Sequence, residues 1–296
     1  MCIRDSVRTS LQALVDVSEV FPTIIKTDLH ATILHIFVTI LGTGACQAAV
    51  VPQALPVFRR FITGITADAH PETHSQLRNL LSRMLLILRN AQKRETEASL
   101  PCEKNTILAI TILLSAAPRV LTDVDPLVSR FARELCDCVD SPMTSRVAAG
   151  CARTLLLSNV ASAQFTQHAI TFLTRPSDVE GLEESRSVTA QTLTMYAGKL
   201  PPSSKQQGAA VALFMAVLLQ RARTEGGKTY PDMAMRLLDL AAVDNASFRA
   251  VVTGMGREEK QFLERVLKSR AAGSQKGRDL DEEREPTIAL KMNFGG

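Results

Sequence analysis

The chain has 296 residues, of which 46% are hydrophobic and 22% are charged, and its formal net charge is +4. This apolar content is sufficient for a packed core and excludes a wholly disordered chain. The mild charge, the lack of Trp and the presence of only two Tyr argue against a nucleic-acid partner, which usually needs basic patches and aromatic stacking platforms. The longest apolar run, 209–219, is shorter than the roughly 20 residues of a membrane span.

The first six residues, Met1 to Ser6, resemble translated adapter sequence, so we expect 1–6 to be a non-native leader. On this interpretation the natural protein continues upstream. The six cysteines are scattered in apolar surroundings, which is typical of reduced thiols in the cytoplasm. Cys136 and Cys138 are two residues apart and would lie on different faces of a helix, which argues against a metal or redox pair.

From residue 7 to residue 270 apolar residues recur with helical spacing, and Gly or Pro separates most of the segments. The pattern predicts helices at about 7–20, 28–41, 52–66, 71–94, 102–116, 125–139, 143–158, 162–174, 181–198, 204–223, 231–242, 246–253 and 257–270. The β-branched run 106–112 is open to a second interpretation as a buried strand, although its flanks and length favour a helix.

The clearest helix spans 71–94 and has one apolar stripe, formed by Leu77, Leu80, Leu81, Met84, Leu85 and Leu88. Its basic residues lie mostly off that stripe. They are Arg78, Arg83, Arg89, Lys93 and Arg94. Such residues are usually the solvated face of a helix, but together with Arg59 and Arg60 they could form a basic surface that attracts acidic protein segments or an anionic membrane.

Joined in pairs, the predicted helices give five or six antiparallel hairpins with no convincing strand between them. This predicts an all-α fold, a right-handed α-solenoid in which each hairpin buries its apolar face on its neighbours over 7–270. Tetratricopeptide and ankyrin signatures are absent, and a spacing of about 40 residues favours HEAT or armadillo units. The charged segment 257–270 has one narrow apolar face, as a terminal capping helix needs.

Residues 271–296 differ in composition, and we expect a flexible charged linker followed by a disordered C-terminal peptide. Ile288, Leu290, Met292 and Phe294 alternate with other residues at a period of two. An extended peptide with this pattern could dock on a partner or on the chain's own solenoid, so these four residues are a candidate docking tail.

No sequence motif predicts catalysis, a cofactor, a metal or a small-molecule substrate. Gly227-Lys228-Thr229 lacks the first glycine and the preceding strand of a phosphate-binding loop. His70 and His74 are four residues apart, but Pro71 stands between them and no third ligand is close in sequence. We therefore expect a non-enzymatic protein.

Two segments near the C-terminus carry a family resemblance. The first runs from Asn245 to Val252 and on through 260–267, and the second is Pro286-Thr287-Ile288-Ala289-Leu290-Lys291-Met292. Both resemble the C-terminus of the large HEAT-repeat accessory proteins of the trans-Golgi and endosomal clathrin adaptor, particularly the fungal members.

The resemblance implies a cytoplasmic accessory protein, peripheral to Golgi and endosomal membranes, that acts through protein contacts in endosome-to-Golgi retrieval, endocytosis and protein localisation. It implies a clathrin adaptor complex as the partner, and it carries over no catalytic residue. Two alternatives stay open. One is an importin-like or kinase-regulatory helical-repeat protein, recognised by binding to a small GTPase or a cargo peptide. The other is a helical enzyme domain, recognised by polar residues that converge in one pocket.

Overall fold

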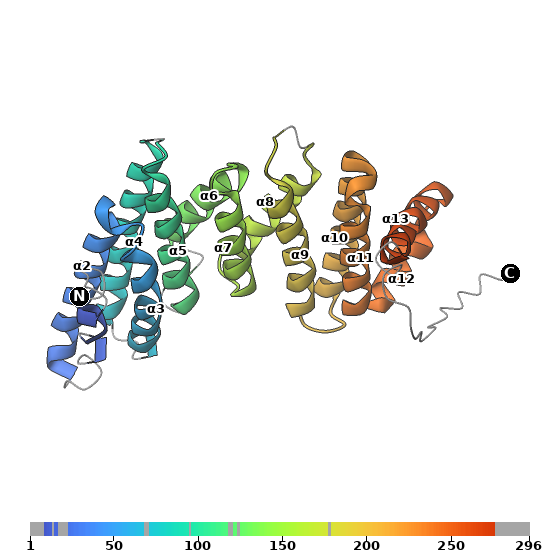
Figure 1. Cartoon of the computed structure of the whole chain (residues 1–296). Helices are drawn as coiled ribbons and strands as arrows, with labels where there is room; N and C mark the ends of the chain where they lie inside the picture. Colours follow the sequence, from blue (N-terminus) through green and yellow to red (C-terminus); the bar gives the residue numbers. More distant parts are fainter. Residues whose placement is uncertain are drawn as a thin grey trace, which may run out of the picture.

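The computed structural model describes residues 9–13, 15–16, 23–67, 71–94, 96–117, 121–122, 125–176 and 179–275. Within these ranges the chain forms helices that follow one another in a row, with no strand (Figure 1). The predicted all-α solenoid is therefore confirmed, and 106–112 lies inside a helix rather than a strand. The leader 1–6 and the tail peptide 276–296 lie outside the described residues.

The helices alternate between two layers. One, the even layer, contains α2 (Thr23–Gly42), α4 (Pro71–Gln92), α6 (Pro126–Asp140), α8 (Ser162–Thr174), α10 (Lys205–Glu225) and α12 (Asn245–Gly254). The other, the odd layer, contains α3 (Val51–Ala67), α5 (Leu100–Ala116), α7 (Ser145–Leu157), α9 (Glu183–Lys199), α11 (Tyr230–Val243) and α13 (Arg257–Gln275). Short 3-10 turns, η1 (Gly44–Cys46) and η2 (Gly226–Thr229), adjoin α2 and α10.

Each helix packs on its neighbours within its own layer and on the adjacent helix of the other layer. In the odd layer α3 contacts α5, α5 contacts α7, and the series continues through α9 and α11 to α13. The even layer is less closely packed, most clearly between α4 and α6.

Local sequence signals set several helix ends. Asp125, Ser204 and Asp244 precede α6, α10 and α12, and each side chain accepts a hydrogen bond from a backbone N–H of the first turn, at 2.9, 3.0 and 3.1 Å. These are N-caps, which satisfy donors that the helix itself leaves unpaired. At the other end of α10, Gly226 adopts φ 75° and ends the helix.

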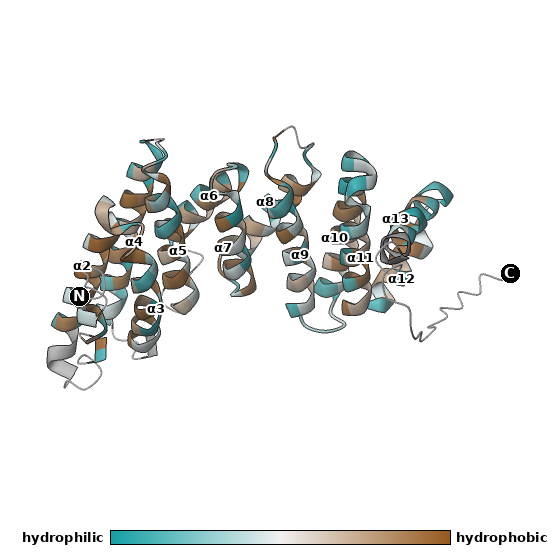
Figure 2. Cartoon of the chain, in the orientation of Figure 1, coloured by the Kyte–Doolittle hydropathy of each residue, from teal (hydrophilic) through white to brown (hydrophobic). Residues whose placement is uncertain are grey.

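The apolar stripe predicted for the 71–94 segment is buried in α4. Hydrophobic segments are concentrated along the middle of helices such as α4 and α10, and hydrophilic segments gather toward helix ends and turns (Figure 2). The core consists of two clusters of buried residues, one formed by the row up to α8 and the other from α8 onward. Helix α8 contributes to both, through Phe165 and Phe172 on one side and Ala169 and Leu173 on the other.

An ionic network is buried in the second cluster. Arg186 of α9 and Arg221 of α10, each with a side chain 3% exposed, both pair with Glu225 at the end of α10. On α11 Asp232 lies 3.9 Å from Arg221 and 3.4 Å from Arg236. The network therefore links three successive helices. Charges buried in this way persist only when they are paired.

Candidate docking surface

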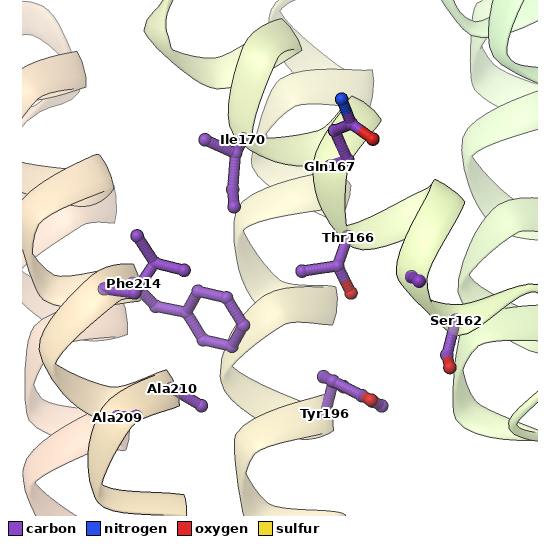
Figure 3. A pocket seen from close by; sticks show the side chains of 10 residues that line it. Ser162, Thr166, Gln167, Ile170, Tyr196, Ala209, Ala210 and Phe214 are labelled. Atoms are coloured by element: carbon purple, nitrogen blue, oxygen red, sulfur yellow. The ribbon is translucent and has the colours of Figure 1, made fainter. Parts of the chain in front are cut away.

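Two grooves on the described part of the chain are candidate docking sites. The even-layer groove, of about 480 Å³, lies between α8 and α10 and is closed below by α9. The ring of Phe214 is directed across it toward Thr166, with Tyr196 at one end (Figure 3). Its other lining residues are apolar or carry small polar groups, and none is charged. They are Ser162, Ala163, Gln167, Ile170, Ala209, Ala210 and Leu213.

The odd-layer groove, of about 450 Å³, crosses α5 between α3 and α7. Leu108 and Ile112 of α5, with Val147 of α7, supply its apolar side chains. The remaining lining residues are small or cationic. They are Arg59, Thr111, Ser115, Arg146, Gly150, Cys151 and Thr154. This groove combines an apolar floor with two guanidinium groups, whereas the even-layer groove has no charge.

A glycine keeps the odd-layer groove open. Gly150 is exposed in the middle of α7, and a Cβ added there would meet no atom within 4 Å. Glycine in a helix interior is destabilising relative to Ala by roughly 0.5–1 kcal/mol. The residue is therefore not required by packing or backbone conformation, and its effect is to leave space on the surface of the odd layer.

The two arginines of this groove are available to a ligand. Arg59 is exposed, and the described residues place no carboxylate within ion-pair distance of its guanidinium group. Arg146 Nε lies 3.1 Å from Glu184 Oε1, but the two side chains are 80% and 58% exposed. An ion pair this exposed contributes at most about 1 kcal/mol, so a competing carboxylate can displace Glu184.

Farther along the odd layer, large apolar side chains face solvent. Met195 of α9 is 39% exposed, and Met235 and Leu238 of α11 are 37% and 41% exposed. The even layer has fewer such residues among those described, with Leu86 on α4 and Leu213 on α10. Exposed apolar side chains on a face that also has a groove are typical of a protein-binding surface.

The five basic residues predicted as a surface lie on α4 and the turn after it, in the even layer. Arg78 pairs with Asp125 at the start of α6 at 3.0 Å, whereas Arg83 Nη1 lies 3.3 Å from His35 Nδ1 of α2. The structure thus directs these two toward different neighbours, while Arg89, Lys93 and Arg94 are exposed. Their joint role as a binding surface stays a prediction, as does that of the docking tail Ile288, Leu290, Met292 and Phe294, which lies outside the described residues.

Neither groove has the chemistry of an active site. Burial raises the pKa of the Cys151 thiol to about 11, and burial with nearby carboxylates raises those of Cys136 and Cys138 to about 12. These thiols are protonated at neutral pH and are poor nucleophiles. Across the described part of the chain no three His, Cys, Asp or Glu side chains are grouped to hold a metal ion.

His168 of α8 lies 3.5 Å from Asp140 of α6, and burial lowers its pKa despite the attraction of that carboxylate. A neutral imidazole beside a carboxylate has one element of a catalytic site. However, neither residue lines either of the two grooves, and the thiol of Cys136, which Asp140 also influences, has a pKa raised to about 12 by burial and nearby carboxylates. Likewise the network of Arg186, Arg221 and Glu225 lies inside the stack, where it links helices and does not face a ligand.

Sequence reasoning found Arg59 only as a basic residue and missed the groove itself, because its walls come from helices about 50 residues apart in the chain. A helical glycine with apolar neighbours, such as Gly150 in α7, is the one local signal that could have indicated it. Within the described ranges, no helix combines the length and apolar character needed to cross a lipid bilayer.

A comparison with known protein families gives one match. A family model described as LAA1-like, C-terminal TPR repeats matches residues 124–279, which includes α6 to α13. No curated protein and no solved structure gives a significant match. The family description names tetratricopeptide repeats, whereas the spacing favoured HEAT or armadillo units. Successive odd-layer helices from α3 to α11 begin roughly 40–50 residues apart, longer than the roughly 34 residues of a tetratricopeptide unit.

Proposed function

Because the chain belongs to the family of LAA1-like C-terminal TPR repeats, we propose that it is a non-enzymatic scaffold in clathrin-adaptor-dependent vesicle trafficking between the trans-Golgi network and endosomes. Helical repeats of this kind generally mediate protein–protein contacts through an extended surface. The proposed partner is a clathrin adaptor complex, and the proposed location is the cytoplasmic side of Golgi and endosomal membranes. Association with the membrane would be peripheral, through the partner.

One observation carries the proposal that the odd layer is the face that binds. It has the exposed apolar side chains of Met195, Met235 and Leu238 together with a groove flanked by the exposed arginines Arg59 and Arg146. Interfaces commonly have apolar anchors, often Met, surrounded by a charged rim that orients the partner.

The experiment is recovery of the adaptor on the whole chain. Tagged chain is incubated with cytosol, and adaptor subunits are measured with antibodies in the recovered fraction. A double variant, Met235→Glu with Leu238→Glu, places two charges on the exposed surface of α11. We expect it to recover at least tenfold less adaptor, since each buried interface anchor is worth on the order of 1–2 kcal/mol.

The matched control is Leu86→Glu, which places a charge on the even layer at a side chain that is 59% exposed. We expect it to recover as much adaptor as the unchanged chain. Failure of the unchanged chain to recover adaptor would contradict the proposal, and so would normal adaptor recruitment to membranes in cells that lack the protein. Equal losses in both variants would assign the effect to charge alone and not to the odd layer.

A further inference from the structure

The odd-layer groove has a chemical preference that can be read from its lining. Arg59 and Arg146 flank an apolar floor made by Leu108, Ile112 and Val147. A ligand that fits must therefore bring carboxylates and bulky apolar side chains close together in one extended segment. A segment whose apolar side chains alternate at a period of two can direct them all at this floor when its backbone is extended.

The chain itself has a segment with this chemistry. Residues 279–285 contain five acidic residues and one basic residue, and they are followed at once by Ile288, Leu290, Met292 and Phe294. We infer that this C-terminal segment docks intramolecularly in the odd-layer groove. Its acidic run would approach the guanidinium group of Arg146, and its alternating apolar side chains would cover Leu108 and Ile112. Arg59, on the far side of the groove, would add to the positive charge that attracts the segment.

The length of the segment permits this placement. Helix α13 ends at Gln275, and α11, α9 and α7 separate it from α5 within the odd layer. Packed helices lie roughly 8–10 Å apart, so the span is about 32–40 Å across the row. The 13 residues from 276 to 288 extend to about 43–47 Å. The acidic run therefore comes within reach of α7, and Ile288 comes within reach of α5.

Charge distinguishes the two grooves as sites for this segment. The even-layer groove is nearer in the row to α13, but no charged side chain lines it, so it offers nothing to the acidic run. In the odd-layer groove Arg59 is unpaired among the described residues, and the competing partner of Arg146 is the exposed Glu184. Electrostatic complementarity contributes more to the choice of site than to raw affinity, and here it selects the odd layer.

The inference can be tested on the whole chain by photo-cross-linking. The photoreactive analogue p-benzoylphenylalanine replaces Phe294, the protein is irradiated at low concentration, and cross-linked peptides are identified by mass spectrometry in the monomeric fraction. We expect cross-links to 100–116 and 145–157, the residues of α5 and α7. Raising the salt to 1 M should reduce their yield, because screening weakens attraction between exposed charges.

Two matched double variants make the test specific. Arg59→Glu with Arg146→Glu reverses the charge of the groove, and we expect the cross-linking yield to fall about fivefold or more, since attraction becomes repulsion at two sites. Lys205→Glu with Arg249→Glu reverses the same number of exposed charges on α10 and α12 of the even layer, outside both grooves, and should leave the yield unchanged. Thermal unfolding of each variant confirms that the fold is intact.

Three results would overturn the inference. These are cross-links that map outside the groove, a yield that the groove variant does not change, and cross-links found only between two copies of the chain. The inference does not depend on the adaptor as the partner. If the chain does not bind adaptor but cross-links normally, only the proposed function is contradicted. If it binds adaptor but the expected cross-links are missing, only the docking of the C-terminal segment is contradicted.

Discussion

The two core clusters treat buried polar groups in different ways. In the first, the main buried polar contact is neutral: Asn105 of α5 donates to the backbone oxygen of Gln47 at 2.8 Å and to its side-chain oxygen at 3.0 Å. In the second, the buried polar contact is the ionic network of Arg186, Arg221 and Glu225. Both satisfy groups that would otherwise destabilise the fold, but the penalty for breaking a charged contact is larger.

The two kinds of buried polar contact join different numbers of helices. The amide pair joins α5 to the turn at η1, so it fixes one connection between neighbouring hairpins. The ionic network joins α9, α10 and α11, and the guanidinium of Arg186 also lies 5.2 Å above the ring of Phe172 in α8. The ionic network, together with the ring of Phe172, therefore links four successive helices from both layers. In the first cluster α2 and α3 are instead joined by apolar contacts such as the stacked rings of Phe37 and Phe58.

The largest expected effect comes from Glu225→Ala. This change leaves two guanidinium groups, each 3% exposed, without the carboxylate that both contact. Breaking a buried ion pair from one side costs about 3–5 kcal/mol. Urea denaturation should show this loss, while Glu184→Ala, which removes an exposed carboxylate, should cost less than about 1 kcal/mol. Similar losses in the two variants would mean that the network does not stabilise the second cluster.

A smaller effect is expected for Asn105→Ala in the first cluster. The change removes the donor to both oxygens of Gln47, which is itself buried. An unsatisfied buried acceptor costs about 1–3 kcal/mol. The same denaturation experiment measures it, with Asn90→Ala, at an exposed position on α4, as the control. A loss as large as that of Glu225→Ala would remove the distinction between neutral and ionic contacts.

The smallest effect concerns α8, which is shared by the two clusters. Burial lowers the pKa of His168 below its ordinary value of 6.5. Below pH 6.5 the unfolded chain binds a proton that the folded chain does not, so the stability contributed by the neutral imidazole is lost as the pH falls. Asp140, Asp137 and Arg175 also face this imidazole, and the two carboxylates reduce the effect.

Thermal unfolding measured from pH 8 down to pH 5 checks this prediction. The chain should lose stability in that window, and His168→Gln should lose less of it because no imidazole titrates. An identical pH profile for the two proteins would mean that other groups cause the decline. A rise in stability at low pH would contradict the direction of the shift itself.

Much of the fold could be predicted from sequence because its signals are local. The stripe from Leu77 to Leu88 predicted α4, and the helix predicted at about 125–139 corresponds to α6 (Pro126–Asp140). Helix α2 begins at Thr23, five residues before the predicted start at 28, and its apolar residues are spread around the helix so that no single stripe marks its start. Helix α13 continues to Gln275, five residues into the segment expected to be a linker.

The ionic network and the grooves could not be predicted from local sequence signals, because they depend on contacts between segments that are distant in the chain. Arg221 and Arg236 each have an acidic residue four positions away, a spacing that is more common on solvated helix surfaces. Only their burial against α9 to α11 shows that they belong to the core. The odd-layer groove likewise exists only when α3, α5 and α7 lie side by side.

Gly150 has a consequence for how such a scaffold can change over evolutionary time. A Cβ atom added at this position would meet no neighbouring atom within 4 Å. A single codon change there could therefore make the hollow shallower, or give it a new shape, while every buried residue of the array stays as it is. The choice of partner at this groove can thus change through single substitutions. The packing of the solenoid is not destabilised by them.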